Sequence, residues 1–246
     1  MHGAGGNVLN FSDLAQRMDP AQPFYALQAS GIDGQRPPHA TIDEMANAYL
    51  DEVRQMQPHG PYLLGGYSGG GLVAFGMAQK LTSAGERIGL LALLDTYAPG
   101  TRAEPMTLRS RLDRLRTEGV RYLTGAVRRR LEERRQARSL SRLDSCLARG
   151  QTVPFDLRDV HLVRSFRRAA MAYEPEPWPG RATLFRAEQV PYGLRGAGSA
   201  YGWERVILRG VEVVRIPGSH HSLLLGRNAD RLAVCLNSAV ERAAVE

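Results

Sequence analysis

The stretch 62–94 limits the possible folds of this chain more than any other. Residues 62–66 form a short apolar run that enters a glycine-rich turn, and a helical pattern follows over about 70–81. Residues 88–94 are continuously apolar, as expected of a strand that is buried on both faces. A strand, a helix and a second strand in this order predict a parallel sheet with crossover helices, and hence an α/β fold.

The segment before this stretch contains further regular structure. Residues 8–18 indicate an amphipathic helix, and residues 24–28 indicate a short strand. Thr41 and Glu44 form a capping box, in which Thr41 caps a helix and Glu44 reaches back. Apolar residues then recur at helical spacing, which predicts a helix over 42–57 with one buried face.

The alternation of strands and helices stops after residue 101. Residues 102–173 indicate two to four charged helices and no strand, and a proline-rich linker follows them. Beyond the linker, the pattern predicts strands over 182–186 and 211–216 and a last helix over 229–240.

These elements favour a single domain over residues 1–246, because α/β units of this size commonly stay single. The expected core comprises about 1–100 and 174–246, with a mostly parallel sheet and helices on both faces. The helical block 101–173 is then an insertion, and insertions of this kind often serve as lids over an active site. No apolar run precedes the glycine-rich segment 2–7, so we expect the first core strand to be missing.

Composition argues against several classes of protein. Of the 246 residues, 43% are apolar, yet no stretch approaches the roughly 18–20 uninterrupted apolar residues of a membrane helix. The first residues carry neither the basic nor the apolar region of a secretory leader. The cysteines, Cys146 and Cys235, form no CxxC pair, which argues against disulfides and structural zinc. We therefore expect a cytoplasmic protein with no metal and no membrane partner.

The formal net charge of +7 is spread unevenly along the chain. Arginines crowd one stretch: Arg102, Arg109, Arg111, Arg114, Arg116, Arg121, Arg128, Arg129, Arg130, Arg134, Arg135, Arg138, Arg142, Arg149, Arg158, Arg164, Arg167 and Arg168. This pattern indicates either a solvated helical surface or a surface that attracts an acidic protein. We expect no nucleic-acid partner, because no aromatic–basic stacking pattern accompanies the arginines.

The turn at 66–70 has the sequence G-x-S-x-G between a strand and a helix, which is the context that a nucleophile elbow requires. Gly66 and Gly70 lack the Cβ atoms that would clash where the strand and helix meet. Ser68 is the expected nucleophile, and the Gly69 N–H is placed to stabilise an oxyanion. A phosphate-binding loop is not indicated, because no lysine precedes Lys80 and G-x-G-x-x-G is missing.

A serine nucleophile needs a base, and the base needs an acid that orients it. In α/β folds that carry a G-x-S-x-G elbow, these residues follow the chain order serine, acid, histidine. Asp95 directly follows the apolar strand 88–94, on the same edge of the sheet as the elbow. His220 and His221 both follow the strand 211–216, and the pattern alone does not decide between them.

Residues 2–7 resemble the glycine-rich loop that supplies the second oxyanion donor in this fold. The Ala4 N–H is the candidate donor, and the Gly5 N–H is the alternative.

With these residues in view, the chain resembles the chain-terminating (type I) thioesterase domains of nonribosomal peptide and polyketide synthases, in the α/β-hydrolase superfamily. Residues 60–75 look like the family's elbow segment, and residues 91–97 look like its acid-bearing strand end. Residues 217–220 match a family pattern, Pro-Gly-Asp-His, that ends in the catalytic histidine. This match selects His220, with Ser219 in place of the usual aspartate.

The resemblance implies a serine thioesterase that releases an acyl, peptidyl or polyketide chain from the phosphopantetheine arm of a carrier domain. It implies an acyl-serine intermediate, release by hydrolysis or macrocyclisation, and no bound cofactor. The partner is then an acyl or peptidyl carrier domain, upstream in the same synthase. The alternatives are a general carboxylesterase and a non-catalytic module that docks a carrier.

Overall fold

The structure is a computed structural model that describes residues 1–101, 120–191, 194 and 196–245. Its centre is a sheet of parallel strands in the order β1-β2-β3-β4. The strands span Tyr62–Tyr67 (β1), Ile88–Leu94 (β2), Ala182–Gln189 (β3) and Val211–Ser219 (β4). The predicted α/β fold with a parallel sheet is therefore confirmed.

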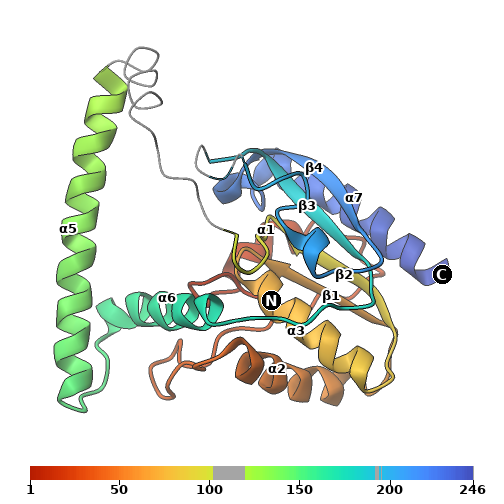
Figure 1. The fold of residues 1–246 in the computed structure, drawn as a ribbon, viewed down its shortest axis with the longest axis horizontal. Helices are drawn as coiled ribbons and strands as arrows, with labels where there is room; N and C mark the ends of the chain where they lie inside the picture. Colours follow the sequence, from red (N-terminus) through yellow and green to blue (C-terminus); the bar gives the residue numbers. More distant parts are fainter. Residues whose placement is uncertain (102–119, 192–193, 195, 246) are drawn as a thin grey trace.

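Helices cover both faces of the sheet (Figure 1). On one face lie α2 (Ile42–Met56) and α3 (Gly70–Ser83), which share a buried cluster with β1 and β2. On the other face, α1 (Ser12–Ala15) and α7 (Gly226–Val245) form a second buried cluster with β2, β3 and β4. The sheet is thus sandwiched between two apolar layers, which explains why β2 is apolar throughout.

Two long helices separate β2 from β3 in the chain. They are α5 (Val120–Ala148) and α6 (Phe155–Met171), and residues 102–119 lie outside the described part. Figure 1 shows α5 at the outer edge of the molecule, with α6 running from its lower end toward the sheet. Leu143 and Cys146 of α5 are buried, whereas residues 130–138 are exposed along the whole segment. Helix α5 is therefore held near its C-terminal end, and α6 connects it to the core.

Several predicted elements match the structure closely. Strand β2 has the predicted bounds, and α2 ends one residue earlier than expected. The Thr41 side chain accepts a hydrogen bond from the Glu44 N–H at 3.0 Å, and the Glu44 carboxylate accepts one from the Ala40 N–H at 2.7 Å. The last helix is longer than predicted at both ends.

Two predictions at the beginning of the chain are wrong. The helix expected over 8–18 is reduced to the 3-10 turn η1 (Leu9–Phe11) and the single turn α1. Residues 24–28 form no strand, since no neighbouring strand accepts their backbone hydrogen bonds and Tyr25 is 71% exposed. A short apolar run does not form a strand unless a sheet edge is there to accept its backbone hydrogen bonds.

The remaining short elements are η3 (Trp203–Arg205) and η4 (His220–Ser222), which flank β4 in the chain. In the described part of the chain, no helix is both long and apolar enough to cross a membrane.

Replacing Phe75 by alanine tests the packing of α3 on the sheet. Phe75 is fully buried and lies against Trp203 and Trp178, with ring centroids 5.0 and 5.9 Å away. We expect Phe75→Ala to lower the free energy of unfolding by about 3–5 kcal/mol, because the cavity cannot collapse against two indole rings. Urea denaturation measures the change. The control Phe155→Ala, at a position 84% exposed, should change it by less than about 1 kcal/mol; equal losses would contradict the packing described.

Candidate active site

The structure brings Ser68, His220 and Asp95 together in one hydrogen-bonded chain. Nε2 of His220 lies 3.1 Å from Oγ of Ser68, and Nδ1 lies 2.8 Å from Oδ2 of Asp95. A carboxylate can only accept, so Nδ1 carries the proton and Nε2 is left to accept from the serine hydroxyl. The side chain of Asp95 is 2% exposed and that of His220 is 24% exposed. These residues thus have the order and geometry of a nucleophile, a base and an orienting acid.

Ser68 sits on a strained turn between β1 and α3. Its φ angle is +54°, a left-handed value that non-glycine residues rarely adopt. The Ser68 N–H donates to the Leu94 carbonyl at 2.9 Å, which fixes the turn to the end of β2. A Cβ on Gly66 would lie 2.2 Å from the Gly70 carbonyl oxygen, so the sharp turn leaves no room for a side chain there. One on Gly70 would meet the His2 carbonyl oxygen at the same distance.

Asp95 is held from three sides. It follows β2 with a φ angle of +49°, and its N–H donates to the Phe185 carbonyl of β3 at 2.8 Å. Its Oδ1 accepts from the Ala187 N–H at 2.8 Å, while Oδ2 faces His220. The carboxylate therefore has a fixed orientation that does not depend on the histidine.

His220 begins η4, directly after β4. The turn is held by the Ser222 hydroxyl, which accepts from the Ser219 N–H at 2.9 Å, and by Asn228, whose amide donates to Ser222. Ser219, the residue that departs from the family pattern, takes part in this turn and contacts neither Ser68 nor Asp95 in the described hydrogen bonds. His221 lies edge-on to His220, with ring centroids 5.4 Å apart.

The N-terminal loop lies beside the elbow. The Met1 amine donates to Gly65, and the Met1 carbonyl accepts from the Tyr67 N–H, a pair of bonds typical of a parallel ladder. A Cβ on Gly3 would lie 3.7 Å from the Cβ of Ser68, so the loop borders the serine. Among the hydrogen bonds of the described residues, none is donated by the backbone N–H of Ala4, Gly5 or Gly69. These donors remain the candidates for an oxyanion site.

A side chain from α6 covers this candidate oxyanion site. A Cβ on Gly69 would lie 2.2 Å from the ring of Phe166, which is 4% exposed. The same ring lies edge-on to His2, with centroids 6.3 Å apart. The inserted helix therefore contacts both the elbow and the N-terminal loop through one aromatic residue that the sequence analysis did not single out.

His2 fixes the N-terminal loop rather than serving as a base. Its Nδ1–H donates to the Gly3 carbonyl at 2.7 Å, and its Nε2 accepts from the Tyr49 hydroxyl at 2.5 Å. The residue is 2% exposed, and burial lowers the pKa of its imidazole to about 4. It is therefore neutral at physiological pH.

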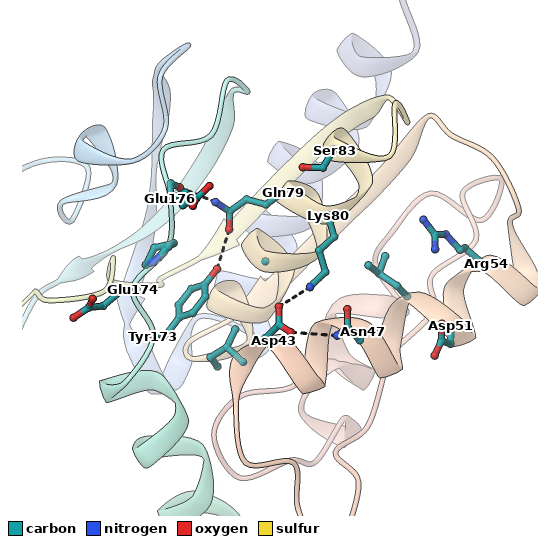
Figure 2. A pocket seen from close by; sticks show the side chains of 14 residues that line it. Asp43, Asn47, Asp51, Arg54, Gln79, Lys80, Ser83, Tyr173, Glu174 and Glu176 are labelled. Carbon is teal, nitrogen blue, oxygen red and sulfur yellow. Dashed lines mark hydrogen bonds and ion pairs between the residues drawn. The ribbon is translucent and has the colours of Figure 1, made fainter.

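A polar cavity of about 560 Å³ lies elsewhere, between α2, α3 and the segment after α6 (Figure 2). Its walls are tied together by an Asp43–Lys80 ion pair and by hydrogen bonds from Tyr173 to Gln79 and from Gln79 to the Glu176 carbonyl. Ser68, Asp95 and His220 are not among its lining residues. The network anchors the end of the insertion to the core.

The described residues hold no group of three or more His, Cys, Asp or Glu side chains arranged to bind a metal ion.

Replacing Gly69 by alanine tests the contact between α6 and the elbow. The new methyl group would overlap the Phe166 ring, so we expect a loss of about 1–3 kcal/mol in the free energy of unfolding. The matched control is Gly5→Ala, where nothing lies within 4 Å of the added atom. When Phe166 is also replaced by alanine, Gly69→Ala should lower the free energy of unfolding by less. If urea denaturation shows the same loss with and without the Phe166 ring, the contact is contradicted.

The burial of His2 predicts a pH-dependent stability. Its pKa falls from 6.5 in the unfolded chain to about 4 in the folded one, so the unfolded chain binds the proton first as the pH falls. Stability is then complete above pH 6.5 and decreases by about 3 kcal/mol as the pH falls to 4. Urea denaturation of the wild type and of His2→Gln, at pH 7 and pH 4.5, measures the difference. If the stability of both proteins depends on pH in the same way, the burial of His2 is not the cause of the pH dependence.

Comparisons with known proteins identify the family of the chain. The chain matches the Thioesterase domain family over residues 1–239. It is 45% identical over 98 residues to malpinin synthetase of Mortierella alpina, covering 40% of this chain and 1% of that protein. It is 43% identical over 109 residues to indigoidine synthase of Dickeya dadantii (strain 3937), covering 44% of this chain and 7% of that protein. A similar protein of Paxillus involutus, at 42% over 95 residues (39% of this chain, 10% of that one), is named an inactive atromentin synthetase.

Solved structures of thioesterase domains share the fold. The NocB thioesterase domain, in a covalent complex with a fluorophosphonate nocardicin G analog, is 28% identical, with a TM-score of 0.62, over 99% of this chain and 92% of that one. A four-domain nonribosomal peptide synthetase is 22% identical, with a TM-score of 0.70, over 96% of this chain and 19% of that one, and this likeness concerns the fold alone. The chain thus spans a small part of its curated synthetase relatives. Because the family match extends over nearly its whole length, the chain belongs to the Thioesterase domain family.

Proposed function

We propose that this domain releases an acyl, peptidyl or polyketide chain from a carrier domain through an acyl-serine intermediate on Ser68. The observation that carries the proposal is the hydrogen-bonded chain from Ser68 through His220 to Asp95. In this proposal Ser68 is the nucleophile, His220 the general base and Asp95 the residue that orients the base.

The chemistry follows from these contacts. His220 takes the Ser68 proton on Nε2 while Oγ attacks the thioester carbonyl, and Asp95 stabilises the imidazolium that forms. The C–S bond then breaks, His220 returns the proton, and the free thiol leaves. Water, or a hydroxyl or amine of the bound chain, repeats the attack on the acyl-serine with the same base. The product is an acid in the first case and a ring in the second.

The negative charge on the carbonyl oxygen needs fixed donors. Gly69 directly follows Ser68, and Ala4 belongs to the loop that borders it through Gly3. Neither backbone N–H donates a hydrogen bond among the described residues, so in this proposal both bind the oxyanion. Phe166 lies against Gly69, and in this proposal its ring shields the Gly69 N–H from water. Excluding water strengthens the interaction of these dipoles with the oxyanion.

The insertion 101–173 acts in this proposal as the lid, within one domain 1–246 whose core is about 1–100 and 174–246. Helix α6 lies over the elbow, and α5 presents Arg130, Arg134, Arg135 and Arg138 to solvent. Of the arginines singled out in the sequence, those at 102–116 lie outside the described residues. The exposed arginines favour an acidic partner, which we take to be the carrier domain upstream in the same synthase. The substrate arrives on the carrier's phosphopantetheine, and the reaction needs no other cofactor.

Some similar proteins are named inactive, so the activity of this chain needs a direct test. Intact-protein mass spectrometry after mixing the protein with an acyl-pantetheine thioester provides it. We expect an acyl adduct on the wild type that turns over to free product. Ser68→Ala should form no adduct and lose thiol release by more than about 1000-fold. The matched control is Ser83→Ala at the other end of α3, which should keep the adduct and the rate.

Other results would favour the two alternative functions. Faster cleavage of an oxygen ester than of the thioester would favour a general carboxylesterase. A folded protein that binds a carrier equally well with and without Ser68, and forms no adduct, would favour a non-catalytic docking module. The mass of the released product separates hydrolysis from macrocyclisation.

A further inference from the structure

Tyr67, the residue before the candidate nucleophile, contacts His220 in two ways. Its ring stacks on the imidazole, with centroids 4.9 Å apart and an angle of 19° between the planes. Its hydroxyl donates a hydrogen bond to the His220 backbone carbonyl at 2.7 Å. A single side chain thus holds both the ring and the backbone of the candidate base.

Tyr67 is itself fixed to the sheet. It is the last residue of β1 and pairs with Leu94 of β2. Its N–H donates to the Met1 carbonyl, and Phe11 lies edge-on to its ring, with centroids 6.4 Å apart. Its position is therefore set by the strand that also carries Ser68, and it offers His220 a rigid surface.

The two hydrogen bonds of the imidazole do not by themselves fix the plane of the ring. Asp95 accepts from Nδ1 and Ser68 donates to Nε2, and both bonds tolerate a tilt of the ring about the line that joins them. A ring stacked at 19° restricts that tilt. The hydroxyl contact adds a second restraint, because it joins η4 to β1.

The stacking also has an electrostatic consequence. The face of an aromatic ring attracts a cation within about 6 Å of its centroid. In the proposed reaction the imidazole of His220 becomes an imidazolium when it takes the serine proton. The ring of Tyr67 therefore stabilises the charged form, which is present only as the reaction proceeds.

We infer that Tyr67 is a positioning residue for the reaction. Its ring holds the imidazole of His220 in the plane that aims Nε2 at Ser68, and stabilises the imidazolium. This inference rests on the proposed function. No proton passes through Tyr67, since burial raises the pKa of its hydroxyl to about 12 and keeps it a donor.

Two substitutions separate the ring from the hydroxyl. Tyr67→Phe keeps the stacked ring and loses the hydrogen bond, and we expect kcat to fall less than about threefold. Tyr67→Leu removes the ring, and we expect kcat to fall roughly 10-fold to 100-fold with KM unchanged, since the lost interaction forms in the transition state. Steady-state thiol release from an acyl-pantetheine thioester measures both constants.

The matched control is Phe11→Leu. Phe11 lies edge-on to the same tyrosine ring and is buried, but it has no described contact with His220. A general loosening of this aromatic cluster would lower kcat in the control as well. We expect the control to keep the wild-type kcat.

A spectroscopic readout separates this inference from the proposed function. The proton NMR signal of the His220 Nδ1–H reports the His220–Asp95 bond in an active or an inactive enzyme. We expect the signal to be preserved in Tyr67→Phe and shifted or broadened in Tyr67→Leu. An unchanged signal and kcat in a folded Tyr67→Leu variant would overturn the inference, and so would equal losses in both variants. If the wild type forms no acyl adduct, the proposed function fails, and the signal alone decides the positioning role.

Discussion

The parallel pairing of β1, β2, β3 and β4 is the constraint on which the rest of the structure depends. Parallel strands end at the same edge of a sheet, and here the register places Tyr67 beside Leu94 and Leu94 beside Phe185. The next residues in the chain, Ser68 and Asp95, therefore leave the sheet side by side. Their N–H groups continue the ladder, because Ser68 donates to the Leu94 carbonyl of β2 and Asp95 donates to the Phe185 carbonyl of β3. His220 joins them since β4 ends at the same edge. Three positions far apart in the sequence become neighbours through backbone pairing alone.

This edge stores strain at two of the three positions. Ser68 and Asp95 both adopt left-handed φ angles, which cost a non-glycine residue roughly 1–2 kcal/mol each. Each strained residue is held by a backbone hydrogen bond to the adjacent strand, and Asp95 also accepts from the Ala187 N–H. The missing Cβ of Gly66 lets α3 start directly against β1. The hydrogen bonds to the sheet thus hold both residues in a conformation that is unfavourable for an isolated residue. As a result, both side chains face His220.

Much of this arrangement can be predicted from sequence, because it depends on local patterns. The apolar run 88–94, the glycines of the elbow and the residue after each strand are sufficient to name Ser68, Asp95 and His220, once a family pattern decides between His220 and His221. Prediction fails where the outcome depends on distant partners. Residues 24–28 are an apolar run that suggests a strand, but they pair with none of the described strands. Tyr67 occupies a variable position of G-x-S-x-G, so nothing local marks its stacking on a residue of η4. Phe166 looks like one more apolar residue on the buried face of α6, and only the fold shows that it lies on Gly69.

The contact between Phe166 and Gly69 links the insertion to the chemistry proposed for the core. Helix α6 contacts the elbow through Phe166, and beyond its C-terminal end the Tyr173–Gln79 hydrogen bond joins the chain to α3. Among the side chains of α5 that the structure describes, Leu143 and Cys146 are buried near the C-terminal end and residues 130–138 are exposed. Any movement of α6 away from the core would remove the ring from a candidate oxyanion donor and from His2, which fixes the loop carrying the other donor. Phe166 therefore links the position of the insertion to the candidate oxyanion site, because the same ring contacts Gly69 and His2.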